Sequence, residues 1–291
     1  MHVRTILEVP TGVVIIVSLL ALTAAAQNAA SQNAAPQNKD KKEFTYSVGP
    51  RAVVSITNNF GPITVKPSGS RQVVVETISH SDAVSLVNEQ HGDRIELRSV
   101  SSRQGTNLVD YTVLVPADAF VSLRSSDGTL RAQGLRGDVI LEAAGASVEV
   151  TDISDAHLHV RTLSGPIRLI DIRNSRLDIH SISGTVTLNN VTGPSVEVNS
   201  GSGRISYDGD PGLAGEYLLT SHSGDLDVSI PASALVEIKA RSIKGQSDPE
   251  FPIVNGFSST DSGNLLFKAG KIRGSRFELR SFRGKISLKR P

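Results

Sequence analysis

Apolar and polar residues alternate along most of the chain after residue 42, in short segments that meet at a glycine. Copies such as LHVRTLSGPIRL from Leu158, LDIHSISGTVTL from Leu177 and VEVNSGSGRISY from Val196 align with the glycine at one position. Alternation with a period of two places apolar side chains on one face of a strand. The pattern therefore predicts two short strands in each copy, with one buried face each, joined at a corner.

The copies recur at intervals of 18 to 21 residues, and aliphatic or aromatic residues fill equivalent positions. A unit of this size cannot bury its apolar face alone, so neighbouring copies must stack. A β-propeller needs about 40 residues in each blade, which argues against that fold. We expect an all-β protein, a right-handed parallel β-solenoid with about 19–21 residues per rung. The column seven positions before the corner contains Val121, Val139, Leu158, Leu177, Val196, Tyr217, Ile238 and Phe277.

A small residue, in most copies serine or threonine, stands three positions before each corner. A hydroxyl at a bend can bond to the backbone of its own turn or of the next rung. We therefore expect a ladder of side-chain to backbone hydrogen bonds along the corner. The members of this column are Ser125, Ala143, Thr162, Ser181, Ser200, Ser221, Ser242 and Ser281.

The two ends of the repeat region are less regular. Residues 43–120 are expected to form irregular N-terminal rungs or a cap, and residues 121–291 the regular solenoid with an insertion at 246–275. The sequence Gln246-Ser247-Asp248-Pro249 is not expected to supply the second strand of its rung. Lys289-Arg290-Pro291 at the end of the chain would protect the last sheet edge by charge and by proline.

The first 26 residues have the pattern of a secretory signal peptide: a basic start, a short apolar run and an Ala-x-Ala end. The alternative is an uncleaved membrane anchor, although this stretch is short for a membrane span. Residues 27–42, QNAASQNAAPQNKDKK, predict a disordered linker. The protein is therefore expected to be exported, to the periplasm, the cell surface or the medium, with no membrane span after cleavage.

Composition narrows the possible functions. Lys and Arg number 30 against 29 for Asp and Glu, so no strong field attracts nucleic acid. The sequence contains no cysteine, which excludes disulfides, cysteine-ligated metals and a cysteine nucleophile. We expect no cofactor, no resident metal and no catalytic residue.

Four aspartates form the one acidic cluster in the sequence, and they are the candidate binding surface: Asp208, Asp210, Asp225 and Asp227. Carboxylates of this kind could bind calcium or a sugar, but their spacing matches no known calcium loop. A second column, with His159, Asp178 and Glu197 on successive rungs, could bind a cation or could be a surface ladder of opposite charges.

The unit Φ-x-Φ-x-[ST]-x-[SD]-G-x-Φ-x-Φ, as in LDIHSISGTVTL and YLLTSHSGDLDV, resembles the repeat of the bacterial putative-adhesin family of β-strand-repeat proteins. The segments VSITNNFGPITVKPSGSRQVVVE and YTVLVPADAFVSLRSSDGTL are similar to the amino-terminal part of that family. The resemblance covers residues 44–291. It implies an exported β-helical domain with an adhesive or surface role and no known catalytic residues, in a family whose members are mostly uncharacterised.

Two classes of function remain open from the sequence. The first is a non-enzymatic, adhesin-like binding or structural module that contacts cell-envelope polysaccharide or a surface protein. The second is a carbohydrate-active enzyme, a lyase or glycosidase on the same scaffold. A low aromatic content of 4% and the lack of a long loop pair argue against the enzyme. A regulatory envelope sensor is neither supported nor excluded.

Overall fold

A computed structural model describes residues 40–102, 107–244 and 274–289, together with short strands at 247–249, 258–260 and 264–269. Every regular element within these residues is a β-strand. The predicted signal peptide and residues 27–39 of the predicted linker lie outside the described residues, and both stay predictions. Residues 40–42 belong to a strand, Asp40–Ser47, and not to a disordered linker.

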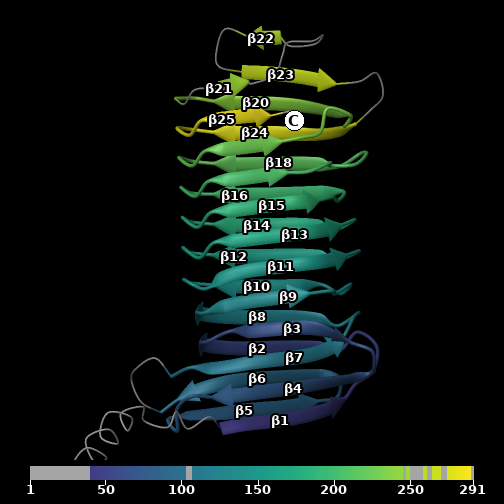
Figure 1. Ribbon diagram of the computed structural model, residues 1–291, viewed down its shortest axis with the longest axis vertical. Helices are drawn as coiled ribbons and strands as arrows, with labels where there is room; N and C mark the ends of the chain where they lie inside the picture. The colour runs from purple at the N-terminus through teal and green to yellow at the C-terminus, as the bar shows by residue number, and fades with distance from the viewer. Residues whose placement is uncertain are drawn as a thin grey trace, which may run out of the picture. The chain divides into compact units, whose positions relative to one another are not determined.

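The described strands form two sheets. Figure 1 shows the strands of both sheets stacked one above another along a single long axis. Sheet A contains, in spatial order, β1 (Asp40–Ser47), β4 (Gln72–Ser79), β7 (Val109–Pro116), β3 (Ile63–Ser68), β9 (Thr129–Gln133), β11 (Ser147–Ser154), β13 (Ile167–Arg173), β15 (Val186–Val191), β17 (Ile205–Asp208), β19 (Leu226–Ser229), β25 (Ile286–Lys289) and β21 (Ser247–Pro249). Sheet B contains, in spatial order, β22 (Ser258–Thr260), β23 (Asn264–Ala269), β20 (Val236–Ser242), β24 (Ser275–Ser281), β18 (Glu216–Ser221), β16 (Ser195–Ser200), β14 (Arg176–Ser181), β12 (His157–Thr162), β10 (Val139–Ala143), β8 (Phe120–Asp127), β2 (Val53–Phe60), β6 (Arg94–Ser101) and β5 (Val84–His91).

Each regular coil consists of a sheet B strand, a glycine-rich corner and a sheet A strand. Successive coils pair in parallel with equivalent residues opposite each other, so that Leu158 pairs with Leu177 and Leu177 pairs with Val196. The parallel β-solenoid predicted from the sequence is confirmed, with a step of 19 residues between these coils (177 − 158 = 196 − 177 = 19). The handedness of the coil stays a prediction.

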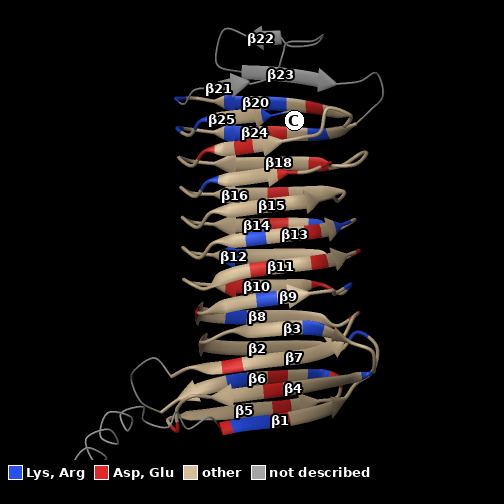
Figure 2. Cartoon of the chain, in the orientation of Figure 1, with Lys and Arg blue, Asp and Glu red and all other residues tan. Residues whose placement is uncertain are grey.

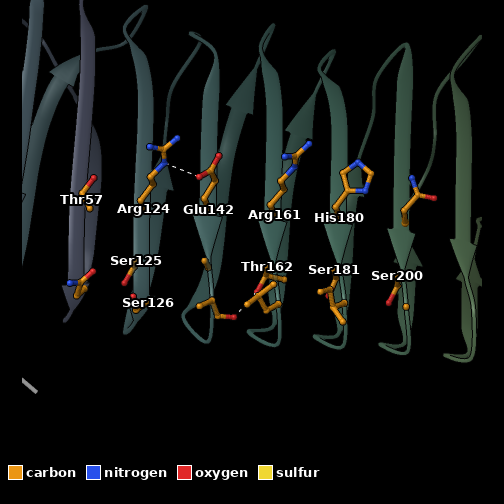
Figure 3. Close-up of a pocket in the computed structure, with 17 residues that line it drawn as sticks. Thr57, Arg124, Ser125, Ser126, Glu142, Arg161, Thr162, His180, Ser181 and Ser200 are labelled. Carbon is orange, nitrogen blue, oxygen red and sulfur yellow. Dashed lines mark hydrogen bonds and ion pairs between the residues drawn. The ribbon is translucent and has the colours of Figure 1, made fainter. Parts of the chain in front are cut away.

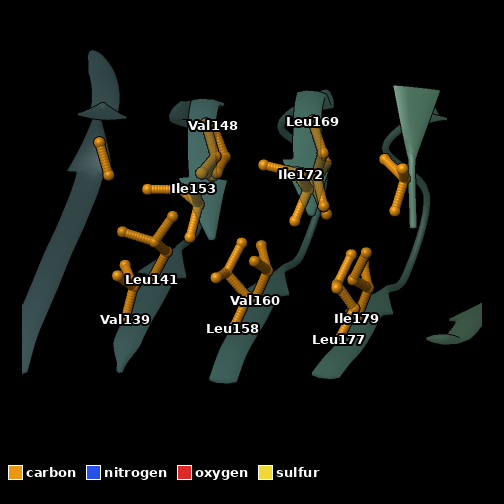
Figure 4. Packing of buried hydrophobic residues seen from close by; sticks show 14 of the residues in the cluster. Val139, Leu141, Val148, Ile153, Leu158, Val160, Leu169, Ile172, Leu177 and Ile179 are labelled. Carbon is orange, nitrogen blue, oxygen red and sulfur yellow. The ribbon is translucent and has the colours of Figure 1, made fainter. Parts of the chain in front are cut away.

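The core is a continuous stack of aliphatic side chains between the two sheets. Val148 and Leu169 from sheet A face Leu141, Val160 and Ile179 from sheet B (Figure 4), and all five are fully buried. Like side chains therefore stack directly above one another, at the strand spacing of about 4.8 Å.

The predicted hydroxyl ladder is present at the corners. Ser181 Oγ donates to the Gly184 carbonyl at 2.8 Å, and Ser200 Oγ donates to the Gly203 carbonyl at 3.0 Å. Ser242 instead donates across the rung boundary, to the Gly284 carbonyl at 2.9 Å. Both modes satisfy buried backbone groups that water cannot reach.

The order of the coils in space differs from their order in the chain at the C-terminal end. Strand β24 lies between β18 and β20, and β25 lies between β19 and β21. The last coil of the chain is therefore inserted between two earlier ones. Two expectations are wrong as a result: Lys289 belongs to an interior strand rather than the last edge, and Ser247–Pro249 does supply a strand, which pairs with β25.

The N-terminal end shows a similar inversion. The coil of β2 and β3 lies between the later coils β6–β7 and β8–β9. Antiparallel strands follow outward, with β5 on β6 in sheet B and β4 and β1 on β7 in sheet A. At the other end, β23 and β22 extend sheet B in antiparallel fashion. The predicted boundaries of cap, solenoid and insertion stay predictions, and much of 246–275 lies outside the described residues.

Candidate functional site

A groove with a volume of about 660 Å³ lies along the corner of sheet B. It crosses six neighbouring strands, β2, β8, β10, β12, β14 and β16, near the end of each. Its direction is therefore along the stack and across the strands (Figure 3). At about 4.8 Å for each of five steps, the groove is about 24 Å long. We call it the corner groove.

Three columns of the repeat build the corner groove, because consecutive residues at a strand end point alternately outward and inward. The outward residues four positions before the corner form a polar wall: Thr57, Arg124, Glu142, Arg161, His180 and Asn199. The small inward residues of the hydroxyl ladder form the floor, and the next outward column forms the opposite wall.

Arginine, glutamate and histidine alternate along the polar wall. Arg124 Nε donates to Glu142 Oε2 at 2.7 Å, and His180 Nε2 lies 2.9 Å from Asp178 Oδ1. Arg161 stands between them with no ion-pair partner among the described residues. Its guanidinium is the cation of this wall that is available to a ligand.

The opposite wall begins with the polar residues Asn59 and Ser126 and is apolar from Ala144 to Ile182. Leu163 is 55% exposed and Ile182 is 61% exposed, and Ala144 and Gly201 continue the same column. Large aliphatic side chains in equivalent, neighbouring positions make a contiguous apolar strip, which is typical of a binding surface. The groove thus offers apolar contact on one side and hydrogen-bonding groups on the other.

The four aspartates of the predicted binding surface lie in two places. Asp225 and Asp227 lie near the corner on the sheet A side, where Arg204 contacts both, at 3.2 Å and 3.1 Å. Asp208 ends β17 at the far side of sheet A, and Asp210 follows in the next loop, where it accepts a hydrogen bond from Gly212 N at 2.9 Å. Among the described residues, no group of three or more His, Asp or Glu could hold a metal ion. The role of these aspartates as a binding surface stays a prediction.

The column of His159, Asp178 and Glu197 has the predicted register. His159 Nδ1 lies 2.9 Å from Asp178 Oδ2, whereas Glu197 accepts a hydrogen bond from Asn199 Nδ2 at 2.9 Å. The three side chains therefore do not converge on one point. Of the two interpretations of this column, a cation site and a surface ladder, the structure favours the ladder.

The sequence predicted the hydroxyl ladder that forms the floor of the corner groove, but it did not identify the groove or its two walls. The signal lies in the column two positions before the corner, where Leu163, Ile182 and Ile243 put aliphatic side chains at an exposed bend. Bends normally carry small polar residues. Three aliphatic residues in one such column therefore mark a surface that a ligand could cover.

These observations define an all-β parallel solenoid with an open groove along one corner, a class of protein that presents a surface rather than a closed pocket. A match to the Toastrack DUF4097 family covers residues 53–271. The chain belongs to the Toastrack DUF4097 family, which confirms the resemblance seen in the repeat unit.

Three solved bacterial structures are similar to this chain. A provisionally named adhesin from Bacteroides fragilis NCTC 9343 is 11% identical with a TM-score of 0.41, over 88% of this chain and 99% of that chain. A provisionally named lipid binding protein from Parabacteroides distasonis ATCC 8503 is 13% identical with a TM-score of 0.38, over 86% and 98%. A provisionally named cell adhesion protein from Clostridium sporogenes ATCC 15579 is 15% identical with a TM-score of 0.26, over 87% and 100%.

None of the curated proteins matches this chain. Across the described residues, no helix is long and apolar enough to cross a membrane.

Proposed function

We propose that this protein is an exported, adhesin-like binding module of the cell envelope, which holds an extended polymer along the corner groove. The polymer is a cell-envelope polysaccharide or a segment of a surface protein. The observation that carries the proposal is the direction of the groove, which runs along the stack across six strands. A site of this length and openness suits a chain-like ligand better than a small molecule, which a protein usually encloses.

The two walls support the same conclusion. Leu163 and Ile182 offer apolar contact to the ligand, and the polar wall offers both donors and acceptors. Because equivalent positions recur at every rung, the groove presents side chains at a regular spacing along an extended polymer. Regular stacking thus converts one repeat unit into an extended binding surface.

We propose that binding occurs without catalysis. Glu142 is the one carboxylate among the residues that line the corner groove, and Arg124 holds it at 2.7 Å. A glycosidase would place two carboxylates on either side of the bond that it cleaves. The export of the protein is a proposal too, and it rests on the amino-terminal sequence pattern.

The test is a binding assay with residues 39–291, which form one compact unit. We expect the double variant Leu163→Glu/Ile182→Glu to bind isolated cell-envelope material at least about tenfold more weakly, because it puts two charges on the apolar wall. Leu213→Glu is the matched control, since Leu213 is 73% exposed and does not line the groove. Equal binding by both variants and the wild type would refute the proposal, and release of new sugar ends from envelope polysaccharide would favour the enzyme instead.

A further inference from the structure

The column that contains Leu163 and Ile182 continues past Gly201 onto the last coils of the stack. Backbone hydrogen bonds give the order: His222 N donates to the Ser200 carbonyl at 3.0 Å, Phe282 N to the Ser221 carbonyl at 3.3 Å, and Ile243 N to the Ser281 carbonyl at 3.2 Å. His222, Phe282 and Ile243 therefore occupy the same column as Leu163 and Ile182. This continuation exists because the last coil is inserted between β18 and β20.

A compact cluster of aromatic and cationic side chains forms at this end of the column. The rings of His222 and Phe282 stack with centroids 5.0 Å apart and planes 10° apart. Lys244 Nζ lies 5.2 Å and Arg283 Cζ lies 5.8 Å from the Phe282 ring centre, as in cation–π contacts. We call these four residues the Phe282 cluster. The Phe282 ring therefore contacts two cations, one from each of two neighbouring coils.

Positive charge extends from the Phe282 cluster onto the adjacent strands. Arg241 on β20 pairs directly with Arg280 on β24, and both side chains are exposed. Arg280 also contacts Glu278 at 2.6 Å, but Arg241 has no ion-pair partner among the described residues. Figure 2 shows Lys and Arg at the corners that follow both strands. Like charges directly opposite each other destabilise a sheet, so an anion bound here would relieve a repulsion.

We propose that the polymer held by this protein is an acidic glycan, and that the Phe282 cluster is the anchoring site for its carboxylates. This inference rests on the proposed function and names the ligand class for the same surface. Arg161 in the groove lies four strand steps from β24, about 19 Å away. A linear glycan that carries a carboxylate on repeating units reaches both cationic positions.

The shape and chemistry of the surface favour a glycan over an acidic peptide or a membrane. Pyranose rings have apolar C–H faces, which suit Leu163, Ile182 and Phe282, and hydroxyls, which suit the donors and acceptors of the polar wall. A polyacidic peptide such as polyglutamate offers carboxylates to the cations but no sugar ring to Leu163, Ile182 and Phe282. A planar bilayer cannot enter a groove that has a wall on each side.

The experiment measures the affinity of residues 39–291 for four probes: polygalacturonate, neutral dextran, polyglutamate and vesicles that contain anionic phospholipid. We expect polygalacturonate to bind most tightly and to weaken as salt rises, because charge contacts at the surface are screened. Lys244→Gln/Arg283→Gln should weaken that binding about tenfold, the combined effect of two partly exposed charge contacts. Arg168→Gln, an exposed arginine on sheet A that does not line the groove, is the control for lost charge and should bind as the wild type does.

A second variant separates the aromatic ring from the charges. Phe282→Leu keeps both cations but loses the ring that positions them, and we expect it to weaken polygalacturonate binding several-fold. Equal affinity for polyglutamate or vesicles would overturn the glycan assignment, and wild-type binding by Lys244→Gln/Arg283→Gln would overturn the anchoring site. In both cases the proposed function stands if Leu163→Glu/Ile182→Glu binds envelope material more weakly than the wild type does. If that variant binds envelope material normally, the proposed function fails as well.

Discussion

At the scale of single residues, the serine three positions before a corner forms a hydrogen bond with the backbone of that corner. Ser221 and Ser281 accept hydrogen bonds from Gly224 N at 2.9 Å and from Gly284 N at 2.8 Å, whereas Ser181 and Ser200 donate to carbonyls. The hydroxyl can serve either role, because it is both donor and acceptor. One residue type therefore satisfies the backbone at corners that differ in geometry.

The core column gives the first prediction. Ile179 is fully buried between Val160 and Val198 of the neighbouring coils. Ile179→Asp should lower the free energy of unfolding by more than about 4 kcal/mol, because it buries an unpaired charge. Thr185→Asp, at an exposed position nearby, should change it by less than about 0.5 kcal/mol. Urea denaturation followed by circular dichroism measures both, and similar values for the two variants would show that the assignment of inward and outward positions is wrong.

Buried tyrosines make stability depend on alkaline pH. Tyr207 and Tyr217 pack edge to face, with ring centres 5.4 Å apart. The Tyr207 hydroxyl donates to the Val191 carbonyl at 3.0 Å, and the Tyr217 hydroxyl donates to the Pro211 carbonyl at 3.0 Å. Burial raises the pKa of Tyr217 to about 12, and it raises the pKa of Tyr207 as well. In the unfolded chain a tyrosine loses its proton near pH 10. Between these values the folded state binds more protons, so the free energy of unfolding must fall as pH rises from about 10 to about 12.

The variant Tyr217→Phe tests this pH dependence. It should cost about 1 kcal/mol at neutral pH, because it removes a buried hydrogen bond. Its free energy of unfolding should then fall less steeply than that of the wild type above pH 10, since one proton no longer titrates. Urea denaturation at a series of alkaline pH values gives the two slopes, and parallel slopes would contradict the assignment to Tyr217.

At the scale of strands and corners, the glycines set the distance between coils. A Cβ on Gly184 would lie 2.0 Å from the Gly165 carbonyl oxygen of the coil below, and a Cβ on Gly203 would lie 2.0 Å from the Gly184 carbonyl oxygen. The corner column therefore contains glycine because the backbone of one coil lies where a side chain of the next would be. Glycine is required at Gly184 and Gly203 because the coils approach closely there, and neither residue has a positive φ that would itself favour glycine.

Gly184→Ala should be destabilising by about 1–3 kcal/mol, the usual cost of forcing atoms into a packed site. Gly69→Ala is the control, because a Cβ at Gly69 meets nothing within 4 Å. The control should leave the midpoint of thermal unfolding nearly unchanged or raise it slightly. If Gly184→Ala unfolds at the same temperature as the wild type, the coils do not stack as closely as described.

The sequence predicts the register within coils but not the order of the coils at the ends. From Val139 to Val196 each column continues in chain order, and every predicted pairing is present. Strands β20 and β24 carry the same pattern, so either could follow β18 without a change in burial. Long-range placement of the last coil depends on the path of the connecting segment, which the alternation of residues does not encode. The same ambiguity applies to β2 at the other end.

Cysteine cross-linking tests the order of the coils. Because the sequence has no native cysteine, a disulfide within the protein can form only between the two introduced cysteines. Thr220 pairs with Arg280, and Arg280 pairs with Arg241. Thr220→Cys/Arg280→Cys should form a disulfide under mild oxidation, because its Cα atoms are about one strand spacing apart. Thr220→Cys/Arg241→Cys should not, since two strand spacings exceed the limit of about 7 Å. The opposite outcome would place β20 next to β18, as the order of the chain alone suggests.

At the scale of the whole molecule, stacking converts a local pattern into a long surface. Residues that are unremarkable in one copy, such as Leu163 or Arg161, become parts of continuous walls when coils align. The sequence predicted a binding surface from four aspartates that are close in the chain. In the structure Asp225 and Asp227 lie near the corner, whereas Asp208 lies at the opposite end of a sheet A strand. From β8 to β16 the corner groove is built by residues 18 or 19 positions apart, and their proximity follows from the repeat.

The most direct test of binding along the corner groove is hydroxyl-radical footprinting of residues 39–291 with and without polygalacturonate. Oxidation of a side chain reports its exposure, and the exposed residues Leu163, Ile182 and Leu213 provide positions inside and outside the groove. We expect the glycan to protect Leu163, Ile182 and Phe282 while oxidation of Leu213 stays unchanged. Protection of Leu213 with undiminished oxidation of Leu163 and Ile182 would place the ligand elsewhere and contradict binding in the groove.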